Sequence, residues 1–168
     1  MNYFELFGIP VQLQVDCNAL RGAFLQLSRR YHPDFFTNEA DQVQEEALEK
    51  SALINEAWKI FQQPEETMAY VLQLKGLLTE NEKYQLDPDF LMEMMEINEA
   101  ITDQDPTQLL AAKERLWQLQ QEIYRPISEI VAQYQDGVTP EPSLLKVKTY
   151  YFQKKYLDRI SAQLSASQ

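Results

Sequence analysis

The chain has 168 residues, enough for one domain or two small ones, and its 45% hydrophobic and 24% charged residues are typical of a soluble globular protein. Its net charge of −11 disfavours nucleic acid and anionic membranes as partners. Because His32 and Cys17 are its only histidine and cysteine, the chain cannot form an internal disulfide, a Cys/His zinc site or a four-cysteine iron–sulfur site. We therefore expect neither a metal nor a cofactor of its own.

The composition also indicates the fold class and the compartment. Only 4 glycines and 8 prolines stand beside abundant Leu, Gln, Glu and Ala, which favours an all-α fold. No Lys or Arg precedes Arg21, and no apolar run approaches the roughly 18 residues that a membrane-spanning helix needs. We expect a cytoplasmic protein that does not act at a membrane.

Residues 1–76 predict an antiparallel pair of helices with a short helix on either side. A helix capped by Asp16 or Asn18 runs to Tyr31, and its apolar positions repeat at helical spacing. Pro33 ends this helix, and a longer one follows after a few residues. Helices joined by so short a loop pack antiparallel.

The loop between these two helices carries the tripeptide His32-Pro33-Asp34. Taken alone, the tripeptide is an ordinary helix-ending turn, since Pro and Asp are common loop residues. Its context is more informative, because the preceding helix carries Arg29 and Arg30 opposite its apolar stripe. The pattern predicts a cationic face beside the loop of an otherwise acidic protein.

Residues 77–87 show no clear period and are predicted to link the first unit to a three-helix bundle over residues 88–168. Three prolines preceded by a capping residue predict the helix starts, at Asp87-Pro88, Asp105-Pro106 and Thr139-Pro140. Within the middle helix, apolar residues recur seven apart in two adjacent series, 109, 116, 123, 130 and 110, 117, 124, 131. Pro126 lies inside this helix and predicts a kink near Glu122.

The first helix of the bundle carries more apolar residues than one core stripe needs. Its core stripe is predicted at Phe90, Met94, Ile97 and Ile101. A second set lies on another face, with acidic neighbours: Leu91, Met92, Met95, Glu96 and Glu99. We interpret this set as a partner-binding patch. The alternatives are that it packs against the first unit or belongs to a broad core.

The last helix shows the same doubling. We predict a core stripe on one face, at Leu145, Phe152, Tyr156 and Ile160, and a separate exposed patch at Leu144, Val147 and Tyr151. Residues 146–159 hold five basic residues and one acid, whereas residues 87–105 hold seven acids and no base. The first and last helices are therefore expected to attract each other modestly.

The tripeptide, the arginine face, the aromatic N-terminal patch and the segment Ile54-Asn55-Glu56-Ala57-Trp58 together resemble a J-domain. In that family the tripeptide stimulates ATP hydrolysis by a DnaK-class chaperone, and the basic helix docks on the ATPase. The resemblance therefore implies an activating loop at His32, Pro33 and Asp34, with docking contacts at Arg29 and Arg30. The sequence departs from the family in the residue after the tripeptide, where a phenylalanine replaces the usual lysine.

Across its whole length, the chain is similar to the HscB family of J-domain co-chaperones in iron–sulfur cluster assembly. The segments that carry this resemblance are residues 3–8 (YFELFG), 31–34 (YHPD), 51–58 (SALINEAW) and 90–93 (FLME). In that family the bundle binds the scaffold protein IscU through its first and last helices. The resemblance implies scaffold-binding residues at Leu91, Met92, Met95, Glu96, Glu99 and Tyr151, with Phe152 as the alternative if the register slips by one.

Nothing in the sequence assembles a nucleophile with a base or a phosphate-binding loop, so we expect no enzymatic activity. The resemblance predicts a co-chaperone that binds an IscU-type scaffold and delivers it to an HscA-class chaperone, whose ATP hydrolysis it stimulates. Two alternatives stay open: a J-domain protein with a different client, and a helical oligomerisation module. We expect a monomer.

Overall fold

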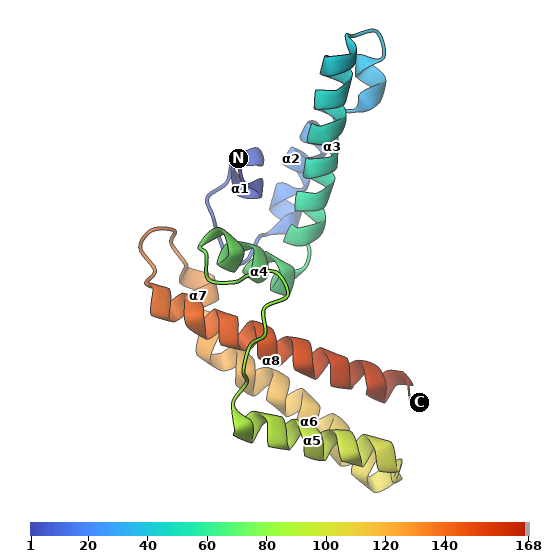
Figure 1. The fold of residues 1–168 in the computed structure, drawn as a ribbon, viewed down its shortest axis with the longest axis vertical. Helices are drawn as coiled ribbons and strands as arrows, with labels where there is room; N and C mark the ends of the chain where they lie inside the picture. Colours follow the sequence, from blue (N-terminus) through green and yellow to red (C-terminus); the bar gives the residue numbers. More distant parts are fainter. Residues whose placement is uncertain (167–168) are drawn as a thin grey trace.

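The computed structural model describes residues 1–166, whose regular elements are all helices with no strand among them, so the predicted all-α fold is confirmed (Figure 1). The elements of the first part of the chain are α1 (Tyr3–Leu6), α2 (Cys17–Arg30), the 3-10 helix η1 (Pro33–Phe36), α3 (Asp41–Phe61) and α4 (Pro64–Leu74). Those of the second part are α5 (Pro88–Asp103), α6 (Pro106–Tyr124), the 3-10 helix η2 (Arg125–Ile127), α7 (Ser128–Gln133) and α8 (Glu141–Ala166).

Helices α2 and α3 form the predicted antiparallel hairpin. The Asp16 carboxylate caps α2 by accepting hydrogen bonds from the backbone N–H groups of Asn18 and Ala19. The two helices meet through aromatic packing, in which the Phe24 and Trp58 rings stack with their centroids 4.6 Å apart. The hairpin projects away from the rest of the molecule and ends in the loop at η1 (Figure 1).

A glycine shortly after Leu74 terminates helix α4. Gly76 has a φ of +71°, a left-handed conformation that glycine adopts without steric cost. This geometry lets the N–H of Gly76 donate to the Gln73 carbonyl at 3.0 Å and that of Leu77 donate to the Leu72 carbonyl at 2.9 Å. These two bonds satisfy carbonyls that the end of a helix otherwise leaves unpaired.

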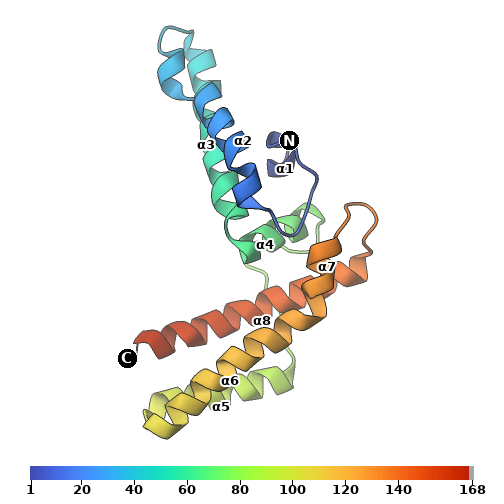
Figure 2. The ribbon, with the colours of Figure 1, turned by 180° about the vertical axis from the view of Figure 1, so that it is seen from behind.

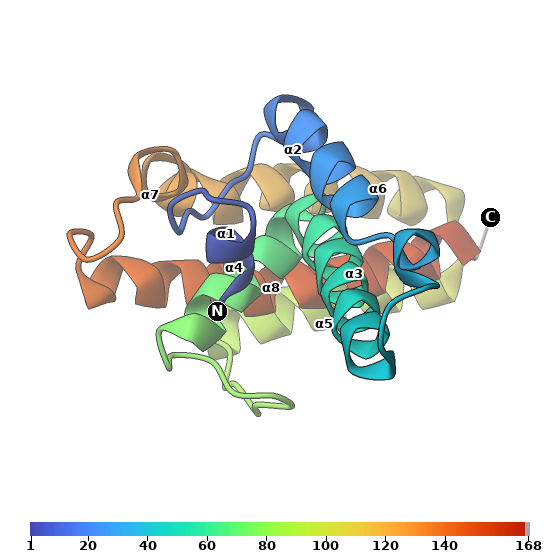
Figure 3. The ribbon, with the colours of Figure 1, turned by 90° about the horizontal axis from the view of Figure 1, so that it is seen from above.

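Helices α5, α6 and α8 run side by side beneath the hairpin (Figure 3). The capping residues predicted for the first two are confirmed, because the Asp87 carboxylate accepts from the N–H of Asp89 and the Asp105 carboxylate from that of Thr107. Helix α8 begins at Glu141, directly after the predicted Thr139-Pro140 start. The predicted three-helix bundle is therefore present.

The kink predicted near Glu122 takes a different form. Helix α6 continues to Tyr124, and a 3-10 turn at residues 125–127 then separates it from the short helix α7. Pro126 is the cause, because it has no N–H to donate to the carbonyl four residues earlier and its ring crowds that position. The proline thus divides the helix rather than bending it, and α7 leaves the line of α6 (Figure 2).

The apolar repeat of α6 is only partly a core pattern. The series containing Leu116 and Ile123 is buried or half-buried, but Leu110 and Trp117 in the adjacent series are 69% and 65% exposed. The second series thus lies partly outside the core, because α5 and α8 cover only one side of α6. These two side chains are an exposed apolar pair.

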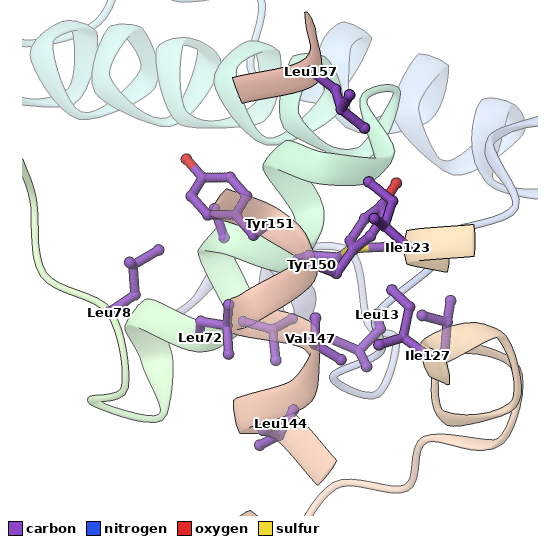
Figure 4. Packing of buried hydrophobic residues seen from close by; sticks show 14 of the residues in the cluster. Leu13, Leu72, Leu78, Ile123, Ile127, Leu144, Val147, Tyr150, Tyr151 and Leu157 are labelled. Carbon is purple, nitrogen blue, oxygen red and sulfur yellow. The ribbon is translucent and has the colours of Figure 1, made fainter. Parts of the chain in front are cut away.

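The hairpin and the bundle share one hydrophobic core. Leu72 of α4 and Val147 of α8 are fully buried where α4 packs on α8, and Leu78 of the connecting segment is buried with them (Figure 4). The segment at residues 75–87 forms no helix, yet it packs on α8 instead of crossing solvent as a free tether. The division of the chain at residues 77–87 stays a prediction.

At the N-terminal end of α8, the buried and exposed faces are the reverse of those predicted. Leu144, Val147 and Tyr151 are buried, whereas Leu145 is 44% exposed. Helix α4 causes this reversal, because it covers α8 from the hairpin side while α5 and α6 cover it from the other (Figure 1). A helix between two layers buries both faces, so its apolar doubling is a consequence of packing.

The expected attraction between α5 and α8 does not appear as ion pairs. Lys148 of α8 pairs with Glu82 of the connecting segment, and Lys154 pairs with Asp158 within α8. In the described part of the chain, no ion pair joins α5 to α8. Among residues 1–166, no helix has both the length and the apolar character that crossing a membrane requires.

Candidate functional site

The His-Pro-Asp loop lies at the free end of the hairpin, where α2 ends and η1 begins (Figure 2). His32 is the N-cap of η1, and Pro33 is its first residue, whose fixed φ suits that position. His32 and Asp34 are exposed, and Pro33 is half-buried. The structure thus places the tripeptide where a partner protein can reach it.

Hydrogen bonds fix the shape of this loop. The N–H of Asp34 donates to His32 Nδ1 at 3.2 Å, and the N–H of Phe35 donates to the His32 carbonyl at 3.1 Å. Since Nδ1 accepts a hydrogen bond, the proton of the neutral ring lies on Nε2. His32 therefore orders the backbone that follows it, and the Asp34 carboxylate remains open to solvent.

The two predicted docking arginines lie one turn before this loop. Arg29 and Arg30 are exposed at the end of α2, and the Arg30 guanidinium lies 5.4 Å from the centre of the Tyr31 ring. Lys50 of α3 approaches the same ring at 5.4 Å. The tip of the hairpin thus holds a cluster of basic groups around one aromatic ring, which agrees with the predicted cationic face.

Phe35 also belongs to the surface of the loop. Its side chain is 72% exposed, and its ring meets that of His32 edge-on with centroids 6.2 Å apart. The departure from the J-domain pattern at this position therefore replaces a charged side chain with an exposed aromatic one. The sequence carried this signal, but it could not show that the side chain points outward.

The second predicted surface lies on α5, at the far side of the bundle from the hairpin (Figure 1). Met92 and Met95 are 61% and 59% exposed, and Leu91 is half-buried beside them. Glu96 and Glu99 are exposed on the same helix. The two methionines therefore neither pack on the first unit nor belong to a broad core, so both alternatives are wrong for them. We call these five residues the α5 face.

Arg115 of α6 holds α5 in place from the other side. Its guanidinium donates to both Glu93 carboxylate oxygens, at 2.7 and 2.9 Å, and to Glu122 at 3.0 Å. Hydrogen bonds to these two carboxylates raise the pKa of Arg115. This clamp could not be predicted from the sequence, because residues on different helices give no periodic signal.

Tyr151 was predicted to be an exposed residue of α8. This prediction is wrong, because its side chain is only 8% exposed. Phe152, the alternative, is half-buried, and its ring stacks on Tyr84 of the connecting segment with centroids 4.5 Å apart. The error has a physical cause: the face of α8 that holds Tyr151 is covered from the hairpin side. Roles in binding for all of these residues stay predictions.

Part of the chain matches a known protein family. A family model described as the HSCB C-terminal oligomerisation domain matches residues 86–165. Two relatives described as co-chaperone protein HscB homologs, from Vibrio parahaemolyticus and Vibrio campbellii, are each 38% identical over 104 residues. This aligned part is 61% of the present chain and 61% of the length of each relative.

Solved structures match the fold over nearly the full chain. The crystal structure of the human co-chaperone protein HscB matches with a TM-score of 0.79 and 24% identity, covering 99% of this chain and 81% of the human one. The chaperone HscB from Vibrio cholerae matches with a TM-score of 0.79 and 27% identity, covering 98% and 96% of the two chains. In sequence, part of the chain is similar to HscB co-chaperones, and in fold nearly all of it is similar to the two HscB structures.

Proposed function

We propose that this protein is a co-chaperone without enzymatic activity of its own. It binds an IscU-type iron–sulfur scaffold protein through the α5 face and delivers it to an HscA-class chaperone, whose ATP hydrolysis the His-Pro-Asp loop stimulates. One observation carries the proposal: a preformed polar loop and an exposed methionine face lie at opposite ends of one continuously packed chain (Figure 1). The names of its relatives, which include the word co-chaperone, support it.

The loop suits recognition of a partner by charge. Its Asp34 carboxylate is exposed and can pair with a cationic side chain, and the exposed Arg29 and Arg30 can pair with acidic groups on the ATPase. Because hydrogen bonds and Pro33 already fix the loop, docking costs little conformational entropy. The loop therefore acts as a rigid contact rather than as a catalytic group.

The α5 face suits binding of a protein with an irregular surface. Methionine side chains are unbranched and polarisable, so Met92 and Met95 can adapt to a partner that lacks a matching groove. The acidic Glu96 and Glu99 at the edge add preference for a partner with basic residues. Apolar contact then supplies affinity, and charge supplies orientation.

Two binding surfaces on one packed chain convert delivery into an intramolecular step. Once the scaffold occupies the α5 face, its local concentration near a chaperone bound at the loop rises, without any new contact. The shared core around Leu72 and Val147 keeps the two surfaces in a fixed relation. Each surface can therefore bind with moderate affinity and still give efficient transfer.

The first experiment tests the loop. Steady-state ATP hydrolysis by an HscA-class chaperone is measured with the protein and with a His32→Gln variant. We expect stimulation by the protein and none by the variant, because glutamine does not reproduce the imidazole that orders Asp34. Circular dichroism checks that the variant is folded, as expected for an exposed position. Retained stimulation in the folded variant would contradict the assignment of the loop.

The second experiment tests the α5 face by calorimetric titration with an IscU-type scaffold. We expect a variant with alanine at Leu91, Met92 and Met95 to bind at least about tenfold more weakly, since each truncated contact at an interface centre costs about 1 kcal/mol or more. The matched control replaces Leu110 and Trp117 of α6 with alanine, because these are equally exposed apolar residues on another face. Equal affinities of the two variants would rule out the α5 face as the site.

A second candidate is self-association through the bundle, which the description of the matching family model as an oligomerisation domain favours. An isologous dimer would bury the exposed methionines of α5 or the apolar pair of α6. Sedimentation at micromolar concentration distinguishes the two candidates. A monomer agrees with the co-chaperone proposal, and a dimer that the scaffold does not dissociate favours self-association.

A further inference from the structure

Tyr84 of the connecting segment is held on α8 by three interactions. Its ring lies parallel to that of Phe152, with centroids 4.5 Å apart and 2° between the planes. Its hydroxyl group lies 2.8 Å from Thr149 Oγ1, and Lys148 Nζ lies 5.7 Å from the ring centre. Thr149 already donates its own proton to the Leu145 carbonyl, so Tyr84 is the donor in the bond between the hydroxyls.

The segment around Tyr84 is fixed as well. Glu82 forms an ion pair with Lys148 at 2.7 Å, and this contact lowers the pKa of the Glu82 carboxylate below its usual range. Leu78, a few residues earlier, is buried in the shared core. A segment anchored at both residues cannot swing away from α8, so the stack of Tyr84 on Phe152 is a persistent feature of the surface.

This stack lies beside the α5 face. The connecting segment crosses α8 on the side of the molecule that also carries α5, while α6 lies behind (Figure 1, Figure 2). At the start of α5, the Phe90 ring contacts Tyr156, which lies one turn beyond Phe152 on α8. Leu91 follows Phe90 directly. Phe152 thus lies one turn from the ring contact that joins α8 to the start of α5, where the half-buried Leu91 begins the α5 face.

We propose that Tyr84 belongs to the scaffold-binding surface: with Phe152 it forms an aromatic ledge that extends this surface from α5 onto α8. This inference rests on the proposed function and names a residue that lies in neither bundle helix. Tyr84 acts as a positioning residue, because stacking restricts the Phe152 ring to one orientation before the partner arrives. A preordered ring loses less entropy on binding.

The test is calorimetric titration of the full chain with a purified IscU-type scaffold. We expect Tyr84→Ala to weaken binding about tenfold and Tyr84→Phe by less than about threefold, because the ring supplies the stack and the hydroxyl supplies only one partly buried hydrogen bond. Tyr134→Ala is the matched control, since Tyr134 is a half-buried tyrosine of another non-helical segment, the loop between α7 and α8. It is expected to bind as the unmodified protein does.

A double-mutant cycle separates positioning from general loss of structure. If Tyr84 acts through Phe152, replacing Tyr84 with alanine in a Phe152→Ala background has a much smaller effect than in the original chain. Stimulation of the chaperone ATPase in the absence of scaffold is expected to stay unchanged, which shows that the hairpin is intact in each variant.

Three outcomes overturn the inference in distinguishable ways. Binding by Tyr84→Ala within twofold of the unmodified chain, while the triple alanine variant of the α5 face is weakened, excludes the ledge and leaves the proposed function standing. Fully additive effects of the Tyr84 and Phe152 replacements exclude positioning. Absence of binding by the unmodified chain overturns both the proposed function and the ledge.

Discussion

The Tyr150 hydroxyl of α8 donates a hydrogen bond to the Glu65 carboxylate of α4, with 3.0 Å between the oxygens. This bond joins the bundle to the first part of the chain, and the Tyr150 side chain is buried. Replacing Tyr150 with phenylalanine keeps the ring and its edge-on contact with Tyr124 but removes the donor. We expect the free energy of unfolding to fall by about 1.5–3 kcal/mol, as for one hydrogen bond to a charged acceptor. Urea denaturation at pH 7 measures this difference.

The same bond makes the stability depend on pH in the alkaline range. Burial, and then the negative charge of Glu65, raise the pKa of Tyr150 above its ordinary value near 10. A raised pKa in the folded state gives a contribution that is complete below the unfolded pKa and is lost as pH rises through the folded one. We therefore expect the stability difference between the protein and Tyr150→Phe to shrink above about pH 10. A difference that stays constant to about pH 12 would contradict this reasoning.

A second polar contact joins the two units at the other end of α4. Lys75, which follows α4, forms an ion pair with Asp136 in the loop before α8, and the Tyr134 hydroxyl donates to the same carboxylate at 2.9 Å. The hydrogen bond from Lys75 lowers the pKa of Asp136, with a further contribution from Tyr134. The contact is partly exposed, so we expect Asp136→Asn to cost only about 0.5–1 kcal/mol at pH 7.

The pH dependence of the Lys75–Asp136 contact has the opposite sign to that of the bond between Tyr150 and Glu65. A lowered pKa in the folded state stabilises the protein above the unfolded pKa, and this contribution disappears as pH falls through the folded value. We expect the stability difference between the protein and Asp136→Asn to close below about pH 4. Asp103→Asn, at an exposed position in α5, is the control and should show no such closing. Thermal unfolding from pH 3 to 7 tests the prediction.

The Arg115 clamp predicts that lysine cannot fully replace arginine at this position. Lysine keeps the charge but cannot donate to Glu93 through two nitrogens and to Glu122 through a third. We expect Arg115→Lys to lower the free energy of unfolding by about 1 kcal/mol, and Lys113→Arg, at an exposed position of the same helix, to change it little. If Arg115→Lys unfolds at the same temperature as the protein, the clamp contributes through charge alone.

Local sequence signals were sufficient to predict the helices and most of their ends. Asp87 and Asp105 precede prolines and cap their helices, and Gly76 ends α4, because each of these effects acts within a few residues. The His-Pro-Asp loop was equally predictable, since the helix that ends before Pro33 puts the loop at the tip. These parts of the fold need no knowledge of what packs on them.

Faces of helices were predictable only where one neighbour covers them. The core stripe of α5 was correct, because Met94, Ile97 and Ile101 are buried while Met92 stays exposed. On α8, helical phase identified two apolar stripes but could not tell which of them a distant element covers. The position of Tyr84 on Phe152 was also beyond reach, because it depends on the path of a segment without periodicity.

Tyr151 and Phe152 allow a direct test of which face of α8 is covered. They are neighbours in sequence, and their rings meet edge-on with centroids 5.2 Å apart. Tyr151 lies in the shared core, so we expect Tyr151→Ala to leave a cavity and lower the free energy of unfolding by about 3 kcal/mol or more. Phe152 is half-buried, so Phe152→Ala loses less stability and instead weakens scaffold binding about tenfold. Urea denaturation and calorimetric titration of both variants give the four values. A stable Tyr151→Ala variant that fails to bind the scaffold would restore Tyr151 as the contact and contradict the packing of α8 against α4.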